Sequence, residues 1–591
     1  MTPLRVTVLA KQVPKGDHGG RLDADGRLER GGAVTEMNPW CRRAVAQGVR
    51  LAQESGGRST AVTMGPASAT DVLREALAWG VDDAVHLSDP ALAGSDCLVT
   101  AKALTGLVDG ADLVLVGASS VDGSTGAIGS MVAELLGLPF AGPVLDLEQQ
   151  EANRIRAVVQ YDNGTESVLI DLPAVIAVAE RSCPPCKVPV EEWPNGENIR
   201  HVTVADLPPA RWGLAGSPTK VTGVRPIGLT REPVIFRGTP KVQVDRAIAE
   251  LFNRGCFDTF DHQPESSPAV PLSANGDQSI FALTGPAPEE CTRALLAAAA
   301  ELAAEIGARV IAVRIDSTAD AADLARWGAD SVVSLTGDEP RPVAAVLAGM
   351  IGELAPWAVI GGALPWEREV LARLAVALDA GLMSDLVSFT IRGDGRLQGL
   401  KPSGGGNLAE IVSHGSPQIA TLRTGMLPLP RARELPAYGH QVLPVGDDPA
   451  ITRFDRRTGH EGDALDRAGV VIGVGRGVDP TQYGALEPIR ELLSAELAAT
   501  RKVTDQGWLP HGRQLGITGR SVAPRMYVAV GLSGNHNHLA GASRAGTVLA
   551  INTDPAAEVF AHCDVGLVAD WQEVMPYLVD GLRERAGRAG A

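Results

Sequence analysis

The sequence has no excess of basic residues. Its 591 residues include 53 lysines and arginines against 70 aspartates and glutamates, a formal net charge of −17. Proteins that bind nucleic acid use a basic face to displace phosphate counterions, so this balance argues against a nucleic-acid partner. It argues in the same way against docking on an anionic lipid surface.

Long apolar runs are also missing. No stretch of 18 uninterrupted apolar residues occurs, so we expect no membrane insertion. The run from Met1 to Lys11 is too short for the apolar region of a signal peptide and has no cleavage pattern. The seven cysteines are odd in number and scattered, which is typical of a reduced compartment. We therefore expect a cytoplasmic protein.

Two of the cysteines form the motif Cys183-Pro-Pro-Cys186. A redox-active pair at this spacing usually opens a helix, whose N-terminus lowers the thiol pKa. The two prolines, and the Lys-Val-Pro-Val segment that follows them, are more typical of a loop. The sequence therefore favours a structural loop here over a redox or metal site.

Strand-like and helical segments alternate almost throughout, which predicts parallel sheets with right-handed crossovers. Two stretches also resemble each other. The pairs Trp79-Gly80 and Trp327-Gly328 are 248 positions apart, and the strands at Asp112–Gly117 and Trp357–Gly361 keep nearly the same offset. Chance rarely preserves both a dipeptide and the order of elements. We therefore expect two homologous α/β domains.

The C-terminal part has strand-like segments that end in glycine or polar residues. One strand runs into Gly473-Val-Gly475-Arg476-Gly477, which is not a Gly-x-Gly-x-x-Gly fingerprint because the third glycine comes one position early. The next strands end at Ser533-Gly534, at Asn552 and at Asp570. Ligands of open parallel sheets bind beyond these strand ends, where glycines let the backbone approach a phosphate. The pattern predicts a bound dinucleotide and leaves its identity open, with Ser533 and Gly534 at its pyrophosphate.

Two other interpretations of this region are weaker. Gly531-Leu-Ser533-Gly-Asn535 resembles a nucleophile elbow, but Asn535 replaces the last glycine and no ordered Asp and His partners are found. His536 and His538 have no cysteine or carboxylate at zinc-ligand spacing. A hydrolase and a zinc site are therefore disfavoured.

The C-terminal residues resemble the FAD domain of the electron transfer flavoprotein α subunit. The matching motifs are Gly475-Arg476-Gly477, Arg501 with Val503-Thr-Asp-Gln-Gly-Trp508-Leu-Pro510, Gly516-Ile-Thr518-Gly519, Tyr527-Val-Ala-Val-Gly-Leu-Ser533-Gly534, His538-Leu-Ala-Gly541, Ala550-Ile-Asn552-Thr-Asp554-Pro555 and Gly566-Leu-Val-Ala-Asp570. The N-terminal half resembles the β subunit, through Met37-Asn38-Pro39, Gly65-Pro66, Ala76-Leu-Ala-Trp-Gly80, Asp112-Leu-Val-Leu-Val-Gly117 and Leu172-Pro173-Ala174-Val175.

The resemblance covers nearly the whole chain, in the order β then α. It implies two homologous parallel-sheet α/β domains of the adenine nucleotide α-hydrolase-like type and a C-terminal doubly wound FAD-binding domain. The expected parts are a β-like domain at 1–209, the β C-terminal arm at 210–258, a linker at 259–277, the α N-terminal domain at 278–430 and the FAD-binding domain at 431–591. One chain would then be a pseudo-heterodimer.

The resemblance also implies which residues contact FAD. They are Arg476, Thr500, Arg501, Ile517, Thr518, Ser533, Gly534, His538, Asn552 and Asp570. Thr518 would donate a hydrogen bond near flavin N5, and Arg501 and His538 would bring positive charge or donors to the N1/O2 edge. A unit charge ~4 Å away at an effective ε of ~20 contributes on the order of 4 kcal/mol. Ile517 departs from the glutamine usual in the family, and Thr500 from its serine.

Family β subunits bind AMP or, in electron-bifurcating members, a second FAD. The residues expected at this second site are Leu9, Asn38, Met64, Asp122, Gly123, Ser124, Thr125 and Gly126. The opening Asp122-Gly-x-Thr125 resembles the bifurcating version, and the occupant stays open between AMP, a second FAD and an empty site.

The function that the resemblance implies is an FAD-containing electron carrier rather than a stand-alone enzyme. A flavin or other redox dehydrogenase would be the donor and a quinone oxidoreductase the acceptor. The expected docking loop, about Cys183 to Trp193, departs from the family pattern. Two alternatives remain: a bifurcating flavoprotein that oxidises NADH with two FADs, and a nucleotide-binding regulator without a redox role.

Overall fold

The structure is a computed structural model that divides into two compact units. It describes residues 2–15, 34–108, 110–151, 153–161, 164–184, 186–226, 231–256, 269–272, 276–315, 320–403, 407–427, 430–458, 464–465, 468–516 and 519–589. Unit 1 comprises Met1–Val224 with Pro268–Gly459, and unit 2 comprises Arg225–Ser267 with His460–Ala591. None of the described helices is long and apolar enough to cross a membrane.

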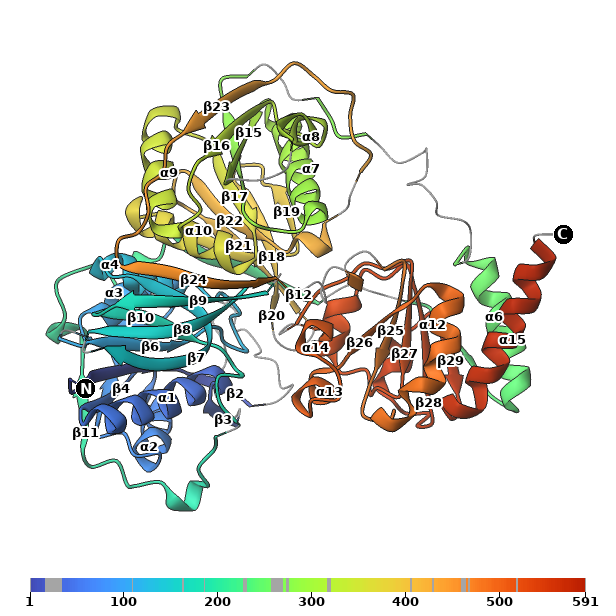
Figure 1. The fold of residues 1–591 in the computed structure, drawn as a ribbon, viewed down its shortest axis with the longest axis horizontal. Helices are drawn as coiled ribbons and strands as arrows, with labels where there is room; N and C mark the ends of the chain where they lie inside the picture. The colour runs from blue at the N-terminus through green and yellow to red at the C-terminus, as the bar shows by residue number, and fades with distance from the viewer. Residues whose placement is uncertain are drawn as a thin grey trace. The chain divides into compact units, whose positions relative to one another are not determined.

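The first half of unit 1 is built on a ten-stranded sheet of the order β11-β5-β4-β1-β6-β10-β7-β8-β9-β24 (Figure 1). Its strands are β1 (Arg5–Ala10), β4 (Arg58–Met64), β5 (Asp83–Leu87), β6 (Leu113–Gly117), β7 (Phe140–Glu151), β8 (Arg154–Tyr161), β9 (Gly164–Asp171), β10 (Ala174–Val178), β11 (Ile199–Val202) and β24 (Ile451–Thr458). The strands from β11 to β10 are parallel, and those from β5 to β10 are buried on both faces. Val8 of β1 packs into the core on one face, and Leu9 into the core on the other.

Helices cover this sheet on both faces. They are α1 (Pro39–Ser55), α2 (Thr70–Ala78), α3 (Cys97–Thr105) and α4 (Ile128–Leu136). Small antiparallel pieces complete the unit: the hairpin of β2 (Gln12–Pro14) and β3 (Thr35–Met37), and the sheet of β12 (Thr219–Pro226), β19 (Ser388–Ile391), β20 (Leu397–Ser403) and β21 (Asn407–Ser413).

The second half of unit 1 repeats this arrangement. Its seven-stranded sheet has the order β18-β22-β17-β14-β15-β16-β23. The strands are β14 (Ser279–Thr284), β15 (Arg309–Ile315), β16 (Ser331–Leu335), β17 (Ala358–Gly362), β18 (Leu382–Leu386), β22 (Gln418–Leu422) and β23 (Gly439–Leu443). The order β16-β15-β14-β17-β22 matches β5-β4-β1-β6-β10, so the predicted pair of homologous α/β domains is confirmed.

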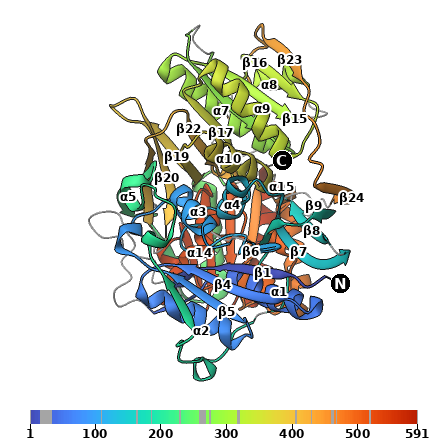
Figure 2. The same ribbon diagram turned by 90° about the vertical axis from the view of Figure 1, so that its left-hand side faces the viewer.

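Four helices sandwich the second sheet. They are α7 (Glu289–Ile306), α8 (Ala321–Arg326), α9 (Pro340–Leu354) and α10 (Pro365–Ala377). Figures 1 and 2 show α7 and α8 on one face, with α9 and α10 on the other. Helix α10 also packs on α4, where the fully buried Arg373 pairs with Glu134 at 2.8 Å and with Glu369 at 3.0 Å. This packing joins the two halves of unit 1.

Unit 2 is a doubly wound α/β domain, as predicted. Its sheet has the order β13-β29-β28-β27-β25-β26, and every pairing is parallel. The strands are β13 (Val234–Phe236), β25 (Val470–Val474), β26 (Glu496–Ala499), β27 (Met526–Val530), β28 (Thr547–Asn552) and β29 (Val565–Val568). Its helices include α6 (Pro240–Asn253), α12 (Glu487–Leu493), α13 (Arg501–Asp505), α14 (His536–Leu539) and α15 (Trp571–Ala589).

The compact units differ from the expected boundaries at two places. Strand β13 pairs with β29, and α6 packs on α15, so these parts of the expected arm belong to the FAD-binding unit. Conversely, β23 pairs with β16 and β24 pairs with β9, so these strands of the expected last domain belong to unit 1. The three strands among them are short or strongly charged segments that add an edge to a sheet, and such segments have little hydrophobic pattern of their own.

Candidate cofactor sites

The sheet of unit 2 changes winding direction between β25 and β27. The chain moves from β25 to β26 on one side, then continues through β27, β28 and β29 on the other. At this point the Gly475 N–H donates to the Val530 carbonyl and the Gly477 N–H to the Gly531 carbonyl, each at 3.0 Å. A Cβ on Gly475 would lie 2.3 Å from the Gly531 oxygen, so only glycine allows this approach. Open α/β sheets bind nucleotides in the crevice at such a switch point.

The loop after β27 is shaped for close backbone approach. Gly534 has φ +88°, and a Cβ there would lie 2.0 Å from the Val559 nitrogen. The Ser533 carbonyl accepts a hydrogen bond from that same nitrogen at 3.0 Å, while the Ser533 side chain is exposed. The loop therefore presents Ser533 and Gly534 at the carboxyl edge of the sheet, where the sequence placed the pyrophosphate.

Asn552 and Asp570 follow the ends of the neighbouring strands. The Asn552 side-chain amide donates to the Leu532 carbonyl at 2.8 Å, and its oxygen accepts from the Asp554 N–H at 2.9 Å. The Asp570 carboxylate accepts from the Gln572 N–H at 2.9 Å, at the start of α15. Both side chains thus hold loops that border the crevice, and both are half-buried.

Arg501 begins α13 directly after β26. Its side chain is 34% exposed, and its Nε donates to the Asp505 carboxylate at 3.4 Å. Thr500 precedes it, with its N–H bonded to the Val474 carbonyl at 3.1 Å, and Arg476 is exposed in the loop after β25. Arg476, Thr500 and Arg501 therefore all stand at the carboxyl edge of the sheet.

His538 is buried in α14, and the structure engages both of its ring nitrogens. The Tyr527 hydroxyl lies 2.6 Å from Nε2, and the Leu515 carbonyl 3.2 Å from Nδ1. Burial lowers the pKa of His538 to about 4. The imidazole is therefore neutral near pH 7, with Nδ1–H donating to the carbonyl. Of the two residues expected to bring positive charge to the flavin, Arg501 carries it and His538 does not.

Ile517 and Thr518 lie outside the described residues. The turn that flanks them is held on both sides: the Gly516 N–H donates to the Arg520 carbonyl at 3.1 Å, and the Arg520 N–H to the Gln514 carbonyl at 2.8 Å. Gly516 has φ +134° and its backbone touches Gly541. Gly516, the last described residue before the two expected flavin contacts, therefore lies beside His538.

The residues expected at the second site lie at the carboxyl edge of the first sheet. Asn38 holds the loop after β6, because its amide donates to the Ser119 carbonyl at 2.7 Å and accepts from the Val121 N–H at 3.3 Å. The Lys11 ammonium lies 2.7 Å from the Asp122 carboxylate. Burial acts to raise the pKa of Asp122, but Lys11 outweighs it and holds that pKa below its usual value.

The remaining residues expected at this second site share the same edge. Leu9 lies near the end of β1 and Met64 at the end of the adjacent β4, while Ser124 and Gly126 turn the loop with φ values of +44° and +60°. Gly123 and Thr125 lie between the turn residues. The structure therefore brings the expected set together along one strip.

Sequence analysis missed the cations that the second half of unit 1 contributes here. A Cβ on Gly126 would lie 2.9 Å from the Arg368 guanidinium. Lys401 is buried beside Ser384, and burial lowers its pKa to about 8 against the opposing charge of Asp385. No motif marks Arg368 or Lys401, since each is far in sequence from the loop after β6.

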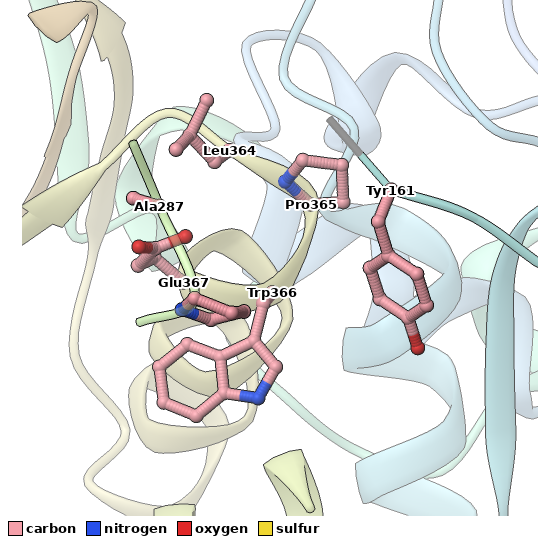
Figure 3. A pocket seen from close by; sticks show the side chains of 7 residues that line it. Tyr161, Ala287, Leu364, Pro365, Trp366 and Glu367 are labelled. Carbon is pink, nitrogen blue, oxygen red and sulfur yellow. The ribbon is translucent and has the colours of Figure 1, made fainter. Parts of the chain in front are cut away.

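The second half of unit 1 has an equivalent carboxyl edge on its own sheet. There the Trp366 side chain occupies the space beside the strand ends. The segments after β14 and β17 line a small cavity with Tyr161 of β8 (Figure 3). The Trp366 indole is buried in it, donates to the Asp338 carbonyl at 2.6 Å and leaves no room for a Cβ at Gly285. At the second edge, the buried Trp366 therefore fills the space beside Gly285.

Comparison with known proteins agrees with this architecture. The model of the electron transfer flavoprotein domain matches residues 25–207 and 285–441, more than half of the chain. This chain belongs to the electron transfer flavoprotein family. The model of the family's FAD-binding domain matches residues 464–543. The predicted FAD, and the function as an FAD-containing electron carrier, are therefore confirmed.

Relatives match the two halves separately. The α subunit of electron transfer flavoprotein from Thermoanaerobacterium thermosaccharolyticum is 30% identical over 308 residues, which are 49% of this chain and 92% of the relative. The β subunit from the same organism is 32% identical over 259 residues, 42% of this chain and 99% of the relative. A subunit of a lactate dehydrogenase (NAD(+),ferredoxin), LctC of Acetobacterium woodii, is 29% identical over 300 residues, 48% of this chain and 71% of the relative. The chain is a fusion of β-like and α-like parts, and its family works with dehydrogenase partners.

Proposed function

We propose that this electron carrier takes electrons from a flavin or other redox dehydrogenase and passes them to a quinone oxidoreductase. The electrons would pass through FAD held at the carboxyl edge of the sheet of unit 2. The observation that carries the proposal is the switch point, where Gly475, Gly477 and Gly534 keep the backbone clear of side chains. FAD, when bound, supplies the reversible acceptance of electrons, and the protein supplies its position and charge environment.

The residues divide by what they offer to the cofactor. Ser533 and Gly534 suit the pyrophosphate, because the loop exposes a hydroxyl and glycine backbone. Asn552 and Asp570 suit the ribose or adenine, and their present hydrogen bonds fix the loops that would border it. Arg476, Thr500, Ile517 and Thr518 complete the proposed set.

Arg501 is the proposed charge that favours an electron-rich ring. Its guanidinium stands at the end of β26, 34% exposed, and pairs with Asp505 at 3.4 Å. His538 is neutral, so its part is to hold the loop around Gly516 through the Leu515 carbonyl. Arg501 would supply the positive charge, and His538 would hold the loop in position.

We further propose that the edge beside Asp122 binds an adenine nucleotide, either AMP or a second FAD. Lys11, Arg368 and Lys401 offer positive charge to a phosphate, and Leu9 and Met64 offer an apolar surface to a base. The similarity to LctC, a subunit of a lactate dehydrogenase (NAD(+),ferredoxin), makes the bifurcating alternative the second candidate function.

One experiment tests these proposals together. The purified chain is denatured, its nucleotides are extracted and counted, and its visible spectrum is followed on addition of NADH. One FAD with one AMP, and no bleaching by NADH, supports the carrier. Two FADs with bleaching support the bifurcating function, and a colourless chain contradicts both.

A further inference from the structure

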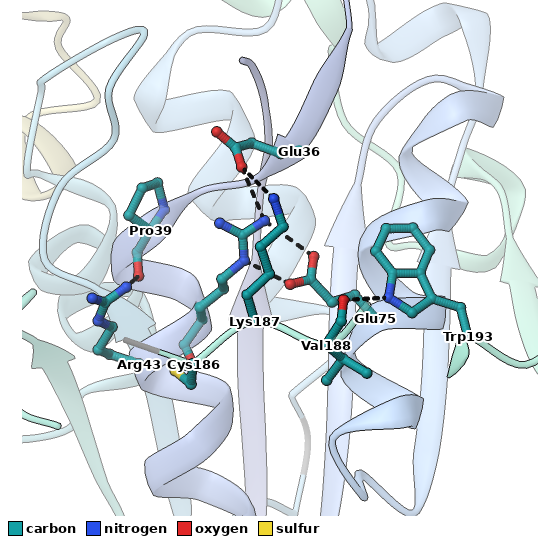
Figure 4. Close-up of polar contacts among 9 residues, drawn as sticks. Glu36, Pro39, Arg43, Glu75, Cys186, Lys187, Val188 and Trp193 are labelled. Atoms are coloured by element: carbon teal, nitrogen blue, oxygen red, sulfur yellow. Dashed lines mark hydrogen bonds and ion pairs between the residues drawn. The ribbon is translucent and has the colours of Figure 1, made fainter. Parts of the chain in front are cut away.

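The segment after β10 carries Cys183 and Cys186. Figure 4 shows Cys186 beside Arg43 of helix α1. The Gln47 amide donates to the Ser182 carbonyl at 2.8 Å, directly before the first cysteine. The Cys186 sulfur lies 3.4 Å from the Arg42 carbonyl oxygen. Both cysteines are therefore held on one side of the same helix, and neither is in a disulfide.

The two thiols have unequal surroundings. Cys183 is half-buried and Cys186 is buried. A hydrogen bond from Cys186 lowers the pKa of Cys183 to about 7, and the Arg43 guanidinium adds to this against the opposing effect of burial. The hydrogen bond to Cys183, together with burial, raises the pKa of Cys186. Near neutral pH the pair thus has one accessible sulfur with about half thiolate character and one protonated, sheltered sulfur.

Two arginines of α1 lie near the cysteine pair and differ in how their charge is compensated. Arg42 is neutralised by Glu75 at 2.6 Å and by Glu36 at 3.2 Å. Among the described contacts of Arg43 there is no carboxylate: its Nη1 donates to the Pro39 carbonyl at 3.2 Å, and its Nε is buried without a hydrogen-bond partner. Arg43 is therefore a cation on α1 whose charge is left for the Cys183 thiolate.

We propose that Cys183 and Cys186 form a redox-active dithiol that reduces low-molecular-weight disulfides. The Cys183 thiolate attacks one sulfur of the substrate, forms a mixed disulfide and releases the first thiolate, which takes a proton from water. Cys186 then gives up its proton and attacks the Cys183 sulfur. The products are the Cys183–Cys186 disulfide and a second small thiol, so two electrons and two protons leave the protein and the substrate is reduced to two thiols.

The proposal departs from the loop interpretation that the sequence favoured. The segment is a loop, since only a short 3-10 turn at Val190–Glu192 follows it. A helix N-terminus is one way to stabilise a thiolate, and a neighbouring cation is another. Here the cation comes from Arg43, which is about 140 positions away in sequence and carries no motif.

The test uses the full chain with glutathione disulfide as the probe. After incubation, acid quench and alkylation, mass mapping should show five of the seven thiols alkylated and a disulfide between Cys183 and Cys186. Cys186→Ser should stop at a mixed disulfide on Cys183, and Cys183→Ser should form none. Cys291→Ser is the matched control, because this half-buried thiol lies in helix α7 and its loss should leave the reaction unchanged.

A second measurement distinguishes redox chemistry from a structural pair. The rate of Cys183 alkylation is followed against pH in the wild type and in the Cys186→Ala variant. In that variant, Cys183 has lost its hydrogen-bond partner. The midpoint of the wild-type pH curve should lie near pH 7. It should rise more in Arg43→Gln than in Arg50→Gln, because Arg50 already pairs with Glu54 at 2.8 Å. Seven alkylated thiols after glutathione disulfide, or a Cys186→Ser chain without mixed disulfide, would overturn the proposal.

Discussion

Replacing Arg501 by glutamine should make the bound FAD harder to reduce. A full charge ~4 Å from the ring at an effective ε of ~20 contributes on the order of 4 kcal/mol. The guanidinium is 34% exposed and pairs with Asp505. We therefore expect solvent and this carboxylate to reduce the interaction of Arg501 with the ring to about 1–2 kcal/mol. For one electron, that corresponds to a fall in potential of about 40–90 mV.

The measurement is a spectroelectrochemical titration of the purified chain. Lys502→Gln is the control, because it removes the same charge from the next, exposed residue and should shift the potential by less than about 20 mV. Asp505→Asn should move the potential upward, since it removes the compensating carboxylate. If the Arg501→Gln variant keeps its FAD and has the same flavin reduction potential as the wild type, the proposed role of Arg501 is refuted.

Three further predictions follow from burial and backbone geometry. Gly534→Ala should reduce the FAD content per chain, since φ is +88° and the new Cβ meets a backbone nitrogen at 2.0 Å; Gly484→Ala, where a Cβ meets nothing within 4 Å, should not. Arg373→Met should destabilise unit 1 by about 3 kcal/mol in urea unfolding, because it leaves the carboxylates of Glu134 and Glu369 without their buried cation. The lowered pKa of His538, about 4 in the folded chain against 6.5 unfolded, means that the unfolded state takes up its proton first. Stability should fall by up to about 3 kcal/mol as pH drops from 6.5 to 4, and His538→Asn should lose that part of the pH dependence.

Much of the fold could be predicted because its strands are buried on both faces. A run such as Arg5–Ala10 has to be covered by helices on each side, and the shared Trp-Gly pairs placed two such sheets in the chain. The edge strands could not be predicted. Ile451–Thr458 carries alternating charge and becomes a strand only because β9 offers it an open edge, so the driving interaction lies outside the segment.

The features of the candidate sites also fall into two groups: those caused by local sequence, which could be predicted, and those caused by distant segments, which could not. The glycines after β25 and β27 were found because a strand end and a turn are local features. The neutral state of His538 could not be predicted, since its low pKa is caused by burial, against the opposing effect of the Leu515 carbonyl. Arg43 beside the cysteine pair, and Arg368 beside Gly126, come from distant segments in the same way. Residue type and spacing thus indicate where a ligand can approach, whereas the charge that it meets there is set by segments that only the tertiary fold brings close.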